Sequence, residues 1–212
     1  MIMSENIITI SRIELVSPRR KIYALYNGEE LLCELSENTL VHFGLYRGTA
    51  VSGERYREIV AYQEFDDGLQ QALRYLQNRP HLRGELAEKL RHKQFRRDVI
   101  EKVLTHLQQK NYLNDAEYTR MFIKEALRAE KTGPLRLRQK LLQKGAATEL
   151  IEEALTRYDD ELQFSVCKRL AEKKLATLSL SAKNDRYKKL SAFLAQKGFY
   201  HETIRAVLAA LL

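Results

Sequence analysis

The sequence predicts a mainly α-helical protein, with a tandem array of three three-helix repeats behind a small N-terminal antiparallel β module. Two observations predict this fold class. One helix–turn–helix pattern is written three times, as "AEKLRHKQFRRDVIEKVL", "RQKLLQKGAATELIEEAL" and "SAFLAQKGFYHETIRAVL". The first quarter of the chain instead alternates apolar and polar residues, as half-buried strands do. Because one helical repeat cannot bury its own apolar face, we expect the repeats to stack into an elongated, curved body.

The first 53 residues carry the strand signals. Residues 6–16 alternate apolar and polar side chains, residues 20–26 form a second apolar stretch, and "EELLCEL" supplies a third. Asn27-Gly28 precedes that third stretch and favours a type I′ turn, which needs positive φ at both central residues. We therefore expect a three-stranded meander that serves as an attachment or interaction module.

A short helix and a long helix follow the strands. Ser36 suits the N-cap of "ENTLVHF", which Gly44 ends, and Ser52 suits the N-cap of a long polar helix from about Glu54. The expected organisation has four parts: the β module with its short helix (1–53), the linking helix and first repeat (54–113), the second repeat (114–158) and the third repeat (159–212).

The three repeats align residue by residue. Equivalent positions are Leu86, Leu137 and Leu190; Lys93, Lys144 and Lys197; and Gln94, Gly145 and Gly198. Leucines spaced four apart form the apolar stripe of one helix, and glycine suits the left-handed residue that ends it. A further helix precedes each pair, and these are expected over 66–78, 114–130 and 159–176.

Two acidic pairs and three tyrosines lead to local predictions. Asp66-Asp67 and Asp159-Asp160 suit the first turn of a helix, where negative charge is favoured by the helix dipole. The tyrosines in apolar register are expected to pack in cores; they are Tyr75, Tyr112 and Tyr118.

The positive charge is localised. The net charge is +8, and the stretch from His81 to Lys140 holds 15 Lys and Arg against eight Asp and Glu, whereas the remaining residues hold 21 against 20. Such a surface attracts polyanions, although solvated helix faces also carry charge. We call the candidate contacts the basic band: Arg91, Lys93, Arg96, Arg97, Lys124, Arg128, Lys131, Arg136, Arg138, Lys140 and Lys144.

Several classes of protein are disfavoured by the composition. The two cysteines and five histidines show no metal-ligand spacing, so we expect no metal site and no cofactor. No stretch assembles a nucleophile, a base and an orienting group, so we expect no enzyme. No apolar run approaches membrane-spanning length and the N-terminus lacks signal-peptide order, which predicts a cytoplasmic protein. Capped terminal repeats favour a monomer.

Three stretches together resemble the RecX regulatory proteins of bacteria. They are "ALRYLQNRPHLRGELAEKL", "NYLNDAEYTRMF" and "KTGPLRLRQKLLQKG", and the resemblance covers about residues 66–210. It implies a non-enzymatic regulator of the RecA recombinase in homologous recombination, DNA repair and the SOS response. Such a protein is expected to lie in the groove of the RecA filament on single-stranded DNA. There it would limit filament extension, strand exchange and ATP hydrolysis, contacting DNA weakly, either directly or through RecA.

The chain departs from the RecX pattern at a few structural positions. Leu82 stands where the family usually has a capping Ser, and Asn111 and Asn114 replace Gly and Asp. Asn tolerates left-handed backbone and also caps helices, so these two changes are expected to be conservative. The alternative function is a stand-alone nucleic-acid-binding protein that reads a groove with its helix–turn–helix-like units. The acidic stretch "ATELIEEAL" disfavours that role for its helix.

Overall fold

The computed structural model describes residues 7–178 and 183–212 of the chain. The chain forms two compact units, which divide it inside the first repeat. The first unit comprises Met1–Asn78 with Lys89–His106, and the second comprises Arg79–Glu88 with Leu107–Leu212. These units follow the contacts between residues and not the repeats, so they do not test the predicted boundaries at residues 53, 113 and 158. Those boundaries remain predictions.

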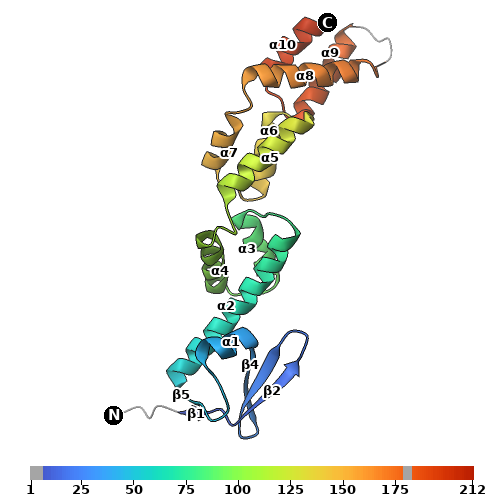
Figure 1. Ribbon diagram of the computed structural model, residues 1–212. Helices are drawn as coiled ribbons and strands as arrows, with labels where there is room; N and C mark the ends of the chain where they lie inside the picture. Colours follow the sequence, from blue (N-terminus) through green and yellow to red (C-terminus); the bar gives the residue numbers. More distant parts are fainter. Residues whose placement is uncertain (1–6, 179–182) are drawn as a thin grey trace. The chain divides into compact units, whose positions relative to one another are not determined.

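The β module of the first unit contains two small sheets (Figure 1). β1 (Ile8–Thr9) pairs with β5 (Ala50–Val51), whereas β2 (Arg12–Ser17), β3 (Ile22–Asn27) and β4 (Glu30–Ser36) form an antiparallel sheet in the order β2-β3-β4. The three-stranded meander is therefore confirmed.

The single first strand expected over residues 6–16 is wrong. It breaks at Ile10, whose N–H donates to Thr49 O, whereas the N–H of Ser11 donates to Tyr26 O in the other sheet. The side chain of Ile10 is 2% exposed within the core of the module. The backbone therefore changes its hydrogen-bonding partner between Ile10 and Ser11, and both partners lie far along the chain. Asn6 lies outside the described residues.

The hairpin between β3 and β4 turns one residue later than predicted. Asn27 pairs with Glu30, so the central residues are Gly28 and Glu29, and of these two only Gly28 has positive φ (62°). A β-bulge opposite Leu25 and Tyr26 shifts the register of β4, and the N–H of Gly28 donates to Ser11 Oγ at 2.8 Å. The predicted type I′ turn at Asn27-Gly28 is thus wrong because long-range pairing sets the register.

α1 (Glu37–Phe43) and α2 (Gly53–Asn78) complete the module. The predicted caps are confirmed: Ser36 Oγ accepts from the N–H of Thr39, Ser52 Oγ accepts from the N–H of Arg55, and Gly44 ends α1 at φ 60°. The predicted helix start at Asp66-Asp67 is wrong, because α2 runs through both residues without a break.

The carboxylate of Asp66 serves another helix instead. It is 3% exposed and accepts hydrogen bonds from Ser36 Oγ at 2.8 Å and Asn38 Nδ2 at 2.9 Å. Gln63 Oε1 accepts from the N–H of Ser36 at 2.8 Å. The start of α1 is therefore held against the middle of α2.

The three predicted helix–turn–helix pairs are confirmed. Their helices are α3 (Arg83–His92) with α4 (Arg97–Gln109), α6 (Pro134–Gln143) with α7 (Thr148–Leu155), and α9 (Lys183–Lys197) with α10 (His201–Leu211). The three turn residues share positive φ: 64° at Gln94, 83° at Gly145 and 88° at Gly198. The preceding helices of the later repeats are α5 (Asp115–Ala129), capped by Asn114, and α8 (Asp160–Leu175), capped by Asp159. Asn111 is also left-handed, with φ 56°.

Two core clusters lie within the second unit, and Leu137 of the second repeat belongs to the cluster of the third. Leu82 packs with Ile123, Leu141 and Ile151 of the second repeat, whereas α10 lies against α8 and α9 in the third (Figure 1). Tyr118 is partly buried against the second repeat's core, but Tyr112 is 64% exposed, so its predicted core position is wrong. Tyr112 lies in the turn before α5, where helical periodicity no longer applies. Tyr75 is half-buried in the first unit.

The departure at Leu82 has a structural explanation. Leu82 is fully buried, and the N–H of Arg83 at the start of α3 donates to Asp115 Oδ1 at 2.8 Å. A carboxylate from α5 thus accepts from one of the free N–H groups at the start of α3, where a serine at position 82 would cap another. Among the described helices, none combines the length and the apolar character that crossing a bilayer requires.

Candidate functional site: a cationic cleft between two repeats

The basic band is divided between the two compact units. Four of its members belong to the first unit: Arg91, Lys93, Arg96 and Arg97. The other seven belong to the second: Lys124, Arg128, Lys131, Arg136, Arg138, Lys140 and Lys144. The structure brings together only some of these side chains, and several already have a carboxylate partner within the protein.

Arg96, Arg138 and Lys144 of the basic band form ion pairs inside their own unit. Arg96 Nη2 lies 2.7 Å from Asp98 Oδ2, and Arg96 Nη1 lies 3.4 Å from Glu64 Oε2. In the second unit, Arg138 Nη2 lies 2.5 Å from Glu152 Oε2. Lys144 Nζ lies 3.5 Å from Glu85 Oε2. A neutralised cation attracts an external anion less strongly, so these residues are weaker candidates for a polyanion contact.

Three other members meet in a cleft within the second unit. The cleft has a volume of about 350 Å³, and its lining consists of Lys131, Thr132, Arg136, Lys140, Gln196 and Lys197. Four of these six side chains are cationic and none is a carboxylate. Lys131, Lys140 and Lys197 form no ion pair within the part of the chain that the structure describes. The cleft is therefore a concentrated positive site on an otherwise mixed surface.

The start of α6 and the end of α9 position the cleft. Gly133 is the N-cap of α6, and Pro134 follows at the first helical position, where a missing N–H costs nothing. The N–H of Gly133 donates to Lys197 O at 2.8 Å, and the N–H of Leu135 donates to Gly198 O at 3.0 Å. The backbones of the second and third repeats are thereby held together directly beneath the cations.

Side-chain contacts orient the cations. Arg136 Nη1 donates to Gln196 O at 2.8 Å, which places the guanidinium across the joint between the two repeats. Lys140 lies one helical turn further along α6, so the two side chains lie on the same face. Lys197 Nζ lies 5.3 Å from the centroid of the Phe193 ring, which partly orients the ammonium group.

Lys197 lines the cleft but does not belong to the basic band predicted from the sequence. The signal that could have found it is the repeat alignment, in which Lys197 is equivalent to Lys93 and Lys144. It lies outside the stretch of surplus positive charge and reaches the cleft only because the third repeat packs against α6. Lys124 and Arg128 are exposed on α5, one turn apart, and do not line the cleft.

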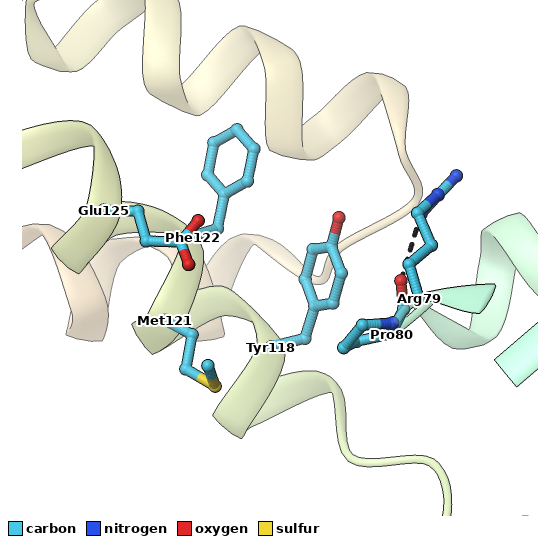
Figure 2. Close-up of a pocket in the computed structure, with 6 residues that line it drawn as sticks. All are labelled: Arg79, Pro80, Tyr118, Met121, Phe122 and Glu125. Carbon is cyan, nitrogen blue, oxygen red and sulfur yellow. Dashed lines mark hydrogen bonds between the residues drawn. The ribbon is translucent and has the colours of Figure 1, made fainter. Parts of the chain in front are cut away.

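A second hollow in the same unit has a different chemistry. Figure 2 shows its six lining residues: four of them, Tyr118, Met121, Phe122 and Glu125, come from α5, while Arg79 and Pro80 come from the loop before α3. Arg79 Nη1 donates to Pro80 O at 3.0 Å, and Glu125 places a carboxylate at the wall. A mainly apolar hollow of about 190 Å³ with an acid in its wall suits a phosphate poorly. Among the described residues, no three potential metal-ligating side chains gather in one place.

Comparison with known proteins identifies the repeats. The chain matches family models for the first (residues 69–107), second (114–155) and third (160–208) three-helix domains of RecX. The regulatory protein RecX of Lactobacillus delbrueckii subsp. bulgaricus is 31% identical over 189 residues, which are 89% of this chain and 70% of that protein. The chain belongs to the RecX family. The RecX of Streptococcus gordonii is also 31% identical, over 89% of this chain and 72% of its own.

Two crystal structures of RecX proteins share the fold. One superposes with a TM-score of 0.79 at 24% identity and covers 94% of this chain and 98% of its own. The other, RecX from Lactobacillus salivarius, gives a TM-score of 0.65 at 27% identity and covers 70% of this chain and 96% of its own. The resemblance of the three helical stretches to the RecX family is therefore confirmed.

Proposed function

We propose that this RecX-family protein regulates the RecA recombinase. It binds in the groove of the filament that RecA forms on single-stranded DNA. Bound there, it inhibits filament extension, strand exchange and ATP hydrolysis during recombination and repair. The observation that carries the proposal is the match of all three repeats to the RecX domains. The cationic cleft supplies a physical means of contact, since the filament contains a polyanion.

Regulation by binding fits the chemistry of the described residues. Backbone hydrogen bonds dock the two helix ends that carry the cations, so these backbones need not rearrange when the cations meet phosphates or acidic side chains. The cleft and the remaining members of the basic band are the contacts we propose. The protein would then act by occupying the filament, without turning over a substrate and without a cofactor.

The first test measures DNA-dependent ATP hydrolysis by the cognate RecA. We expect inhibition at protein concentrations well below that of RecA, because one bound molecule blocks the extension of a whole filament. Unchanged hydrolysis at equal concentrations of the two proteins would refute the proposal. Tight, sequence-dependent binding to naked duplex DNA would instead favour the stand-alone nucleic-acid-binding protein.

A pair of charge reversals tests which cations act. Lys131→Glu with Lys140→Glu removes unpaired charge from the cleft, whereas Arg96→Glu with Arg97→Glu changes the same net charge in the first unit. We expect the cleft pair to raise the half-inhibitory concentration about tenfold, which corresponds to roughly 1.4 kcal/mol of binding. A smaller effect is expected for the other pair, since Arg96 is neutralised internally. Equal effects of the two pairs would contradict the assignment of the cleft.

A further inference from the structure

Two joints between successive repeats are built alike within the second unit. At the first joint, the start of α3 meets the turn between α6 and α7, where a Cβ added to Gly84 would lie 3.2 Å from Gly145 Cα. At the second joint, the start of α6 meets the turn between α9 and α10, where a Cβ on Gly133 would lie 2.4 Å from Gly198 O. In both joints, a turn with a left-handed glycine receives the first residues of a helix.

The same two positions carry charge at each joint. Each turn places a lysine just before its left-handed glycine: Lys144 at the first joint and Lys197 at the second. The third residue of the incoming helix is Glu85 in α3 and Arg136 in α6. These pairs are also equivalent in the repeat alignment, so the two joints form a natural comparison within one chain.

The first joint contains its own anion. The carboxylate of Glu85 lies 3.5 Å from Lys144 Nζ and is also paired with Arg79. Both cations that flank it therefore have a carboxylate partner, and the hollow at this joint has the carboxylates of Glu85 and Glu88 in its lining. An external anion would be repelled by these carboxylates.

The second joint has a cation in place of that carboxylate. Arg136 stands where Glu85 stands in the first joint, and Lys131 and Lys140 add two further charges beside Lys197. Four cations without a carboxylate in a cleft of about 350 Å³ repel one another, so an external anion that enters relieves this repulsion. The second joint is thus the first joint without its built-in counter-ion.

We propose that the second joint is a phosphate site that holds a backbone phosphodiester of a nucleic-acid strand, and that the first joint is its internally neutralised counterpart. The guanidinium of Arg136 spends one N–H on Gln196 O and retains others for phosphate oxygens. Lys131, Lys140 and Lys197 act as mobile point charges around it. A carboxylate of a protein ligand would bring one negative charge to four cations. A nucleic-acid strand carries a negative phosphate at every nucleotide, so it matches the charge of the cleft better.

Recognition at this joint rests on side chains. The N–H groups of Gly133 and Leu135 at the start of α6 already donate to Lys197 O and Gly198 O, so they are not available to a ligand. Contacts of this kind read the backbone of the strand and carry no information about its bases. Binding should therefore depend strongly on salt and little on sequence.

A variant that converts the second joint into the first tests the proposal. R136E places a carboxylate beside Lys197, as Glu85 lies beside Lys144. Binding of a labelled single-stranded oligonucleotide to the full chain, without RecA, is measured by fluorescence anisotropy over a range of NaCl concentrations. We expect R136E to weaken binding at least about tenfold and to reduce the slope of log affinity against log salt by about one or more.

Matched variants make the result specific. R205E changes the same charge at an exposed residue of α10 that does not line the cleft, and we expect a much smaller loss. K140E gives the same loss as R136E without disturbing the contact with Gln196, which guards against a folding defect in R136E. The reverse change, E85Q, frees Lys144 and Arg79 and should strengthen binding a few-fold.

Several outcomes overturn the proposal. Equal losses in R136E and R205E would show that only net charge matters, and unchanged binding in both R136E and K140E would show that the cleft holds no phosphate. Competition by an acidic peptide as effective as an unlabelled strand would assign the cleft to protein carboxylates. Competition by inorganic phosphate at equal phosphate concentration would assign it to a free anion. Because RecA is absent, a negative result here leaves the test of filament inhibition intact.

Discussion

Glu85 connects two repeats through a single carboxylate. Burial would raise its pKa, but the hydrogen bond from Arg79 and the charges of Lys144, Arg79 and His81 outweigh burial and hold the pKa below its ordinary value. A hydrogen-bonded carboxylate flanked by cations prefers its charged form. The ionisation of this one side chain is therefore linked to the folding of the second unit.

This linkage predicts a pH dependence of stability. Because the folded pKa of Glu85 lies below its unfolded value, its contribution is complete above the unfolded pKa, about 4.3, and is lost as the pH falls through the folded pKa. Glu85→Gln removes this titration. We expect the urea midpoint of the unmodified protein to fall more steeply between about pH 5 and 3 than that of the variant.

The comparison is best made as the difference between the two midpoints at each pH. That difference should be largest at neutral pH and shrink on acidification, since protonated glutamic acid resembles glutamine. A constant difference over the whole range would show that Glu85 titrates normally.

At the scale of elements, α2 holds the β module through side-chain hydrogen bonds to α1 and β4. Asp66 receives hydrogen bonds from Ser36 and Asn38 at the start of α1, and Tyr56 Oη donates to Leu32 O of β4 at 2.6 Å. Gly68 lies two residues after Asp66 on α2, where an added Cβ would lie 3.2 Å from Val103 of α4. One helix thus contacts the β module and a helix of the first repeat.

Replacement of the adjacent aspartates Asp66 and Asp67 on α2 should change the free energy of unfolding by different amounts. Asp66→Ala removes the buried acceptor of two hydrogen bonds, one from half-buried Ser36 and one from exposed Asn38, and we expect a loss of about 1–3 kcal/mol in the free energy of unfolding. Asp67→Ala is the control, because burial raises the pKa of Asp67 and its charged form gains little from folding. Chemical denaturation at pH 7 measures both, and similar losses for the two variants would contradict the role assigned to Asp66.

At the scale of the whole molecule, stability depends on how repeats stack within the second unit. The glycines at the two joints allow backbones to approach where a side chain would not fit. Gly133 is the tighter case, since an added Cβ would lie 2.4 Å from Gly198 O and 2.6 Å from the nitrogen of Phe199. Neither backbone atom can move aside as a flexible side chain does.

Gly133→Ala is therefore expected to weaken the joint between the second and third repeats. Overpacking of this kind costs about 1–3 kcal/mol, and backbone atoms place the variant at the upper end. Gly84→Ala is the matched variant at the first joint, where the added Cβ would lie 3.2 Å from Gly145 Cα and a smaller loss should follow. Thermal unfolding of the two variants shows which one loses more stability. A larger loss of stability in Gly84→Ala than in Gly133→Ala would contradict the geometry.

Much of the helical architecture was predictable from local patterns. The three helix–turn–helix pairs, the left-handed turn residues and the caps at Ser36, Ser52 and Asp159 all follow from residues a few positions apart. Two of the predictions that were wrong involve distant partners. Asp66 binds a segment some thirty residues away, and Ile10 turns inward to a core shared with Leu35 and Ile59.

The sequence alone determined that this is a basic, three-repeat helical protein of the RecX type, because period, caps and turn residues are properties of short stretches. Only the tertiary structure decided which cations have counter-ions. Arg138 is neutralised by Glu152 and Lys144 by Glu85, whereas Arg136 donates to Gln196 O, 60 residues further along the chain, and lines a cleft with Lys197. The sequence gives only the net charge, which is a sum over residues. The electrostatic energy depends on the distances between charged groups, and these distances are set only when the repeats pack.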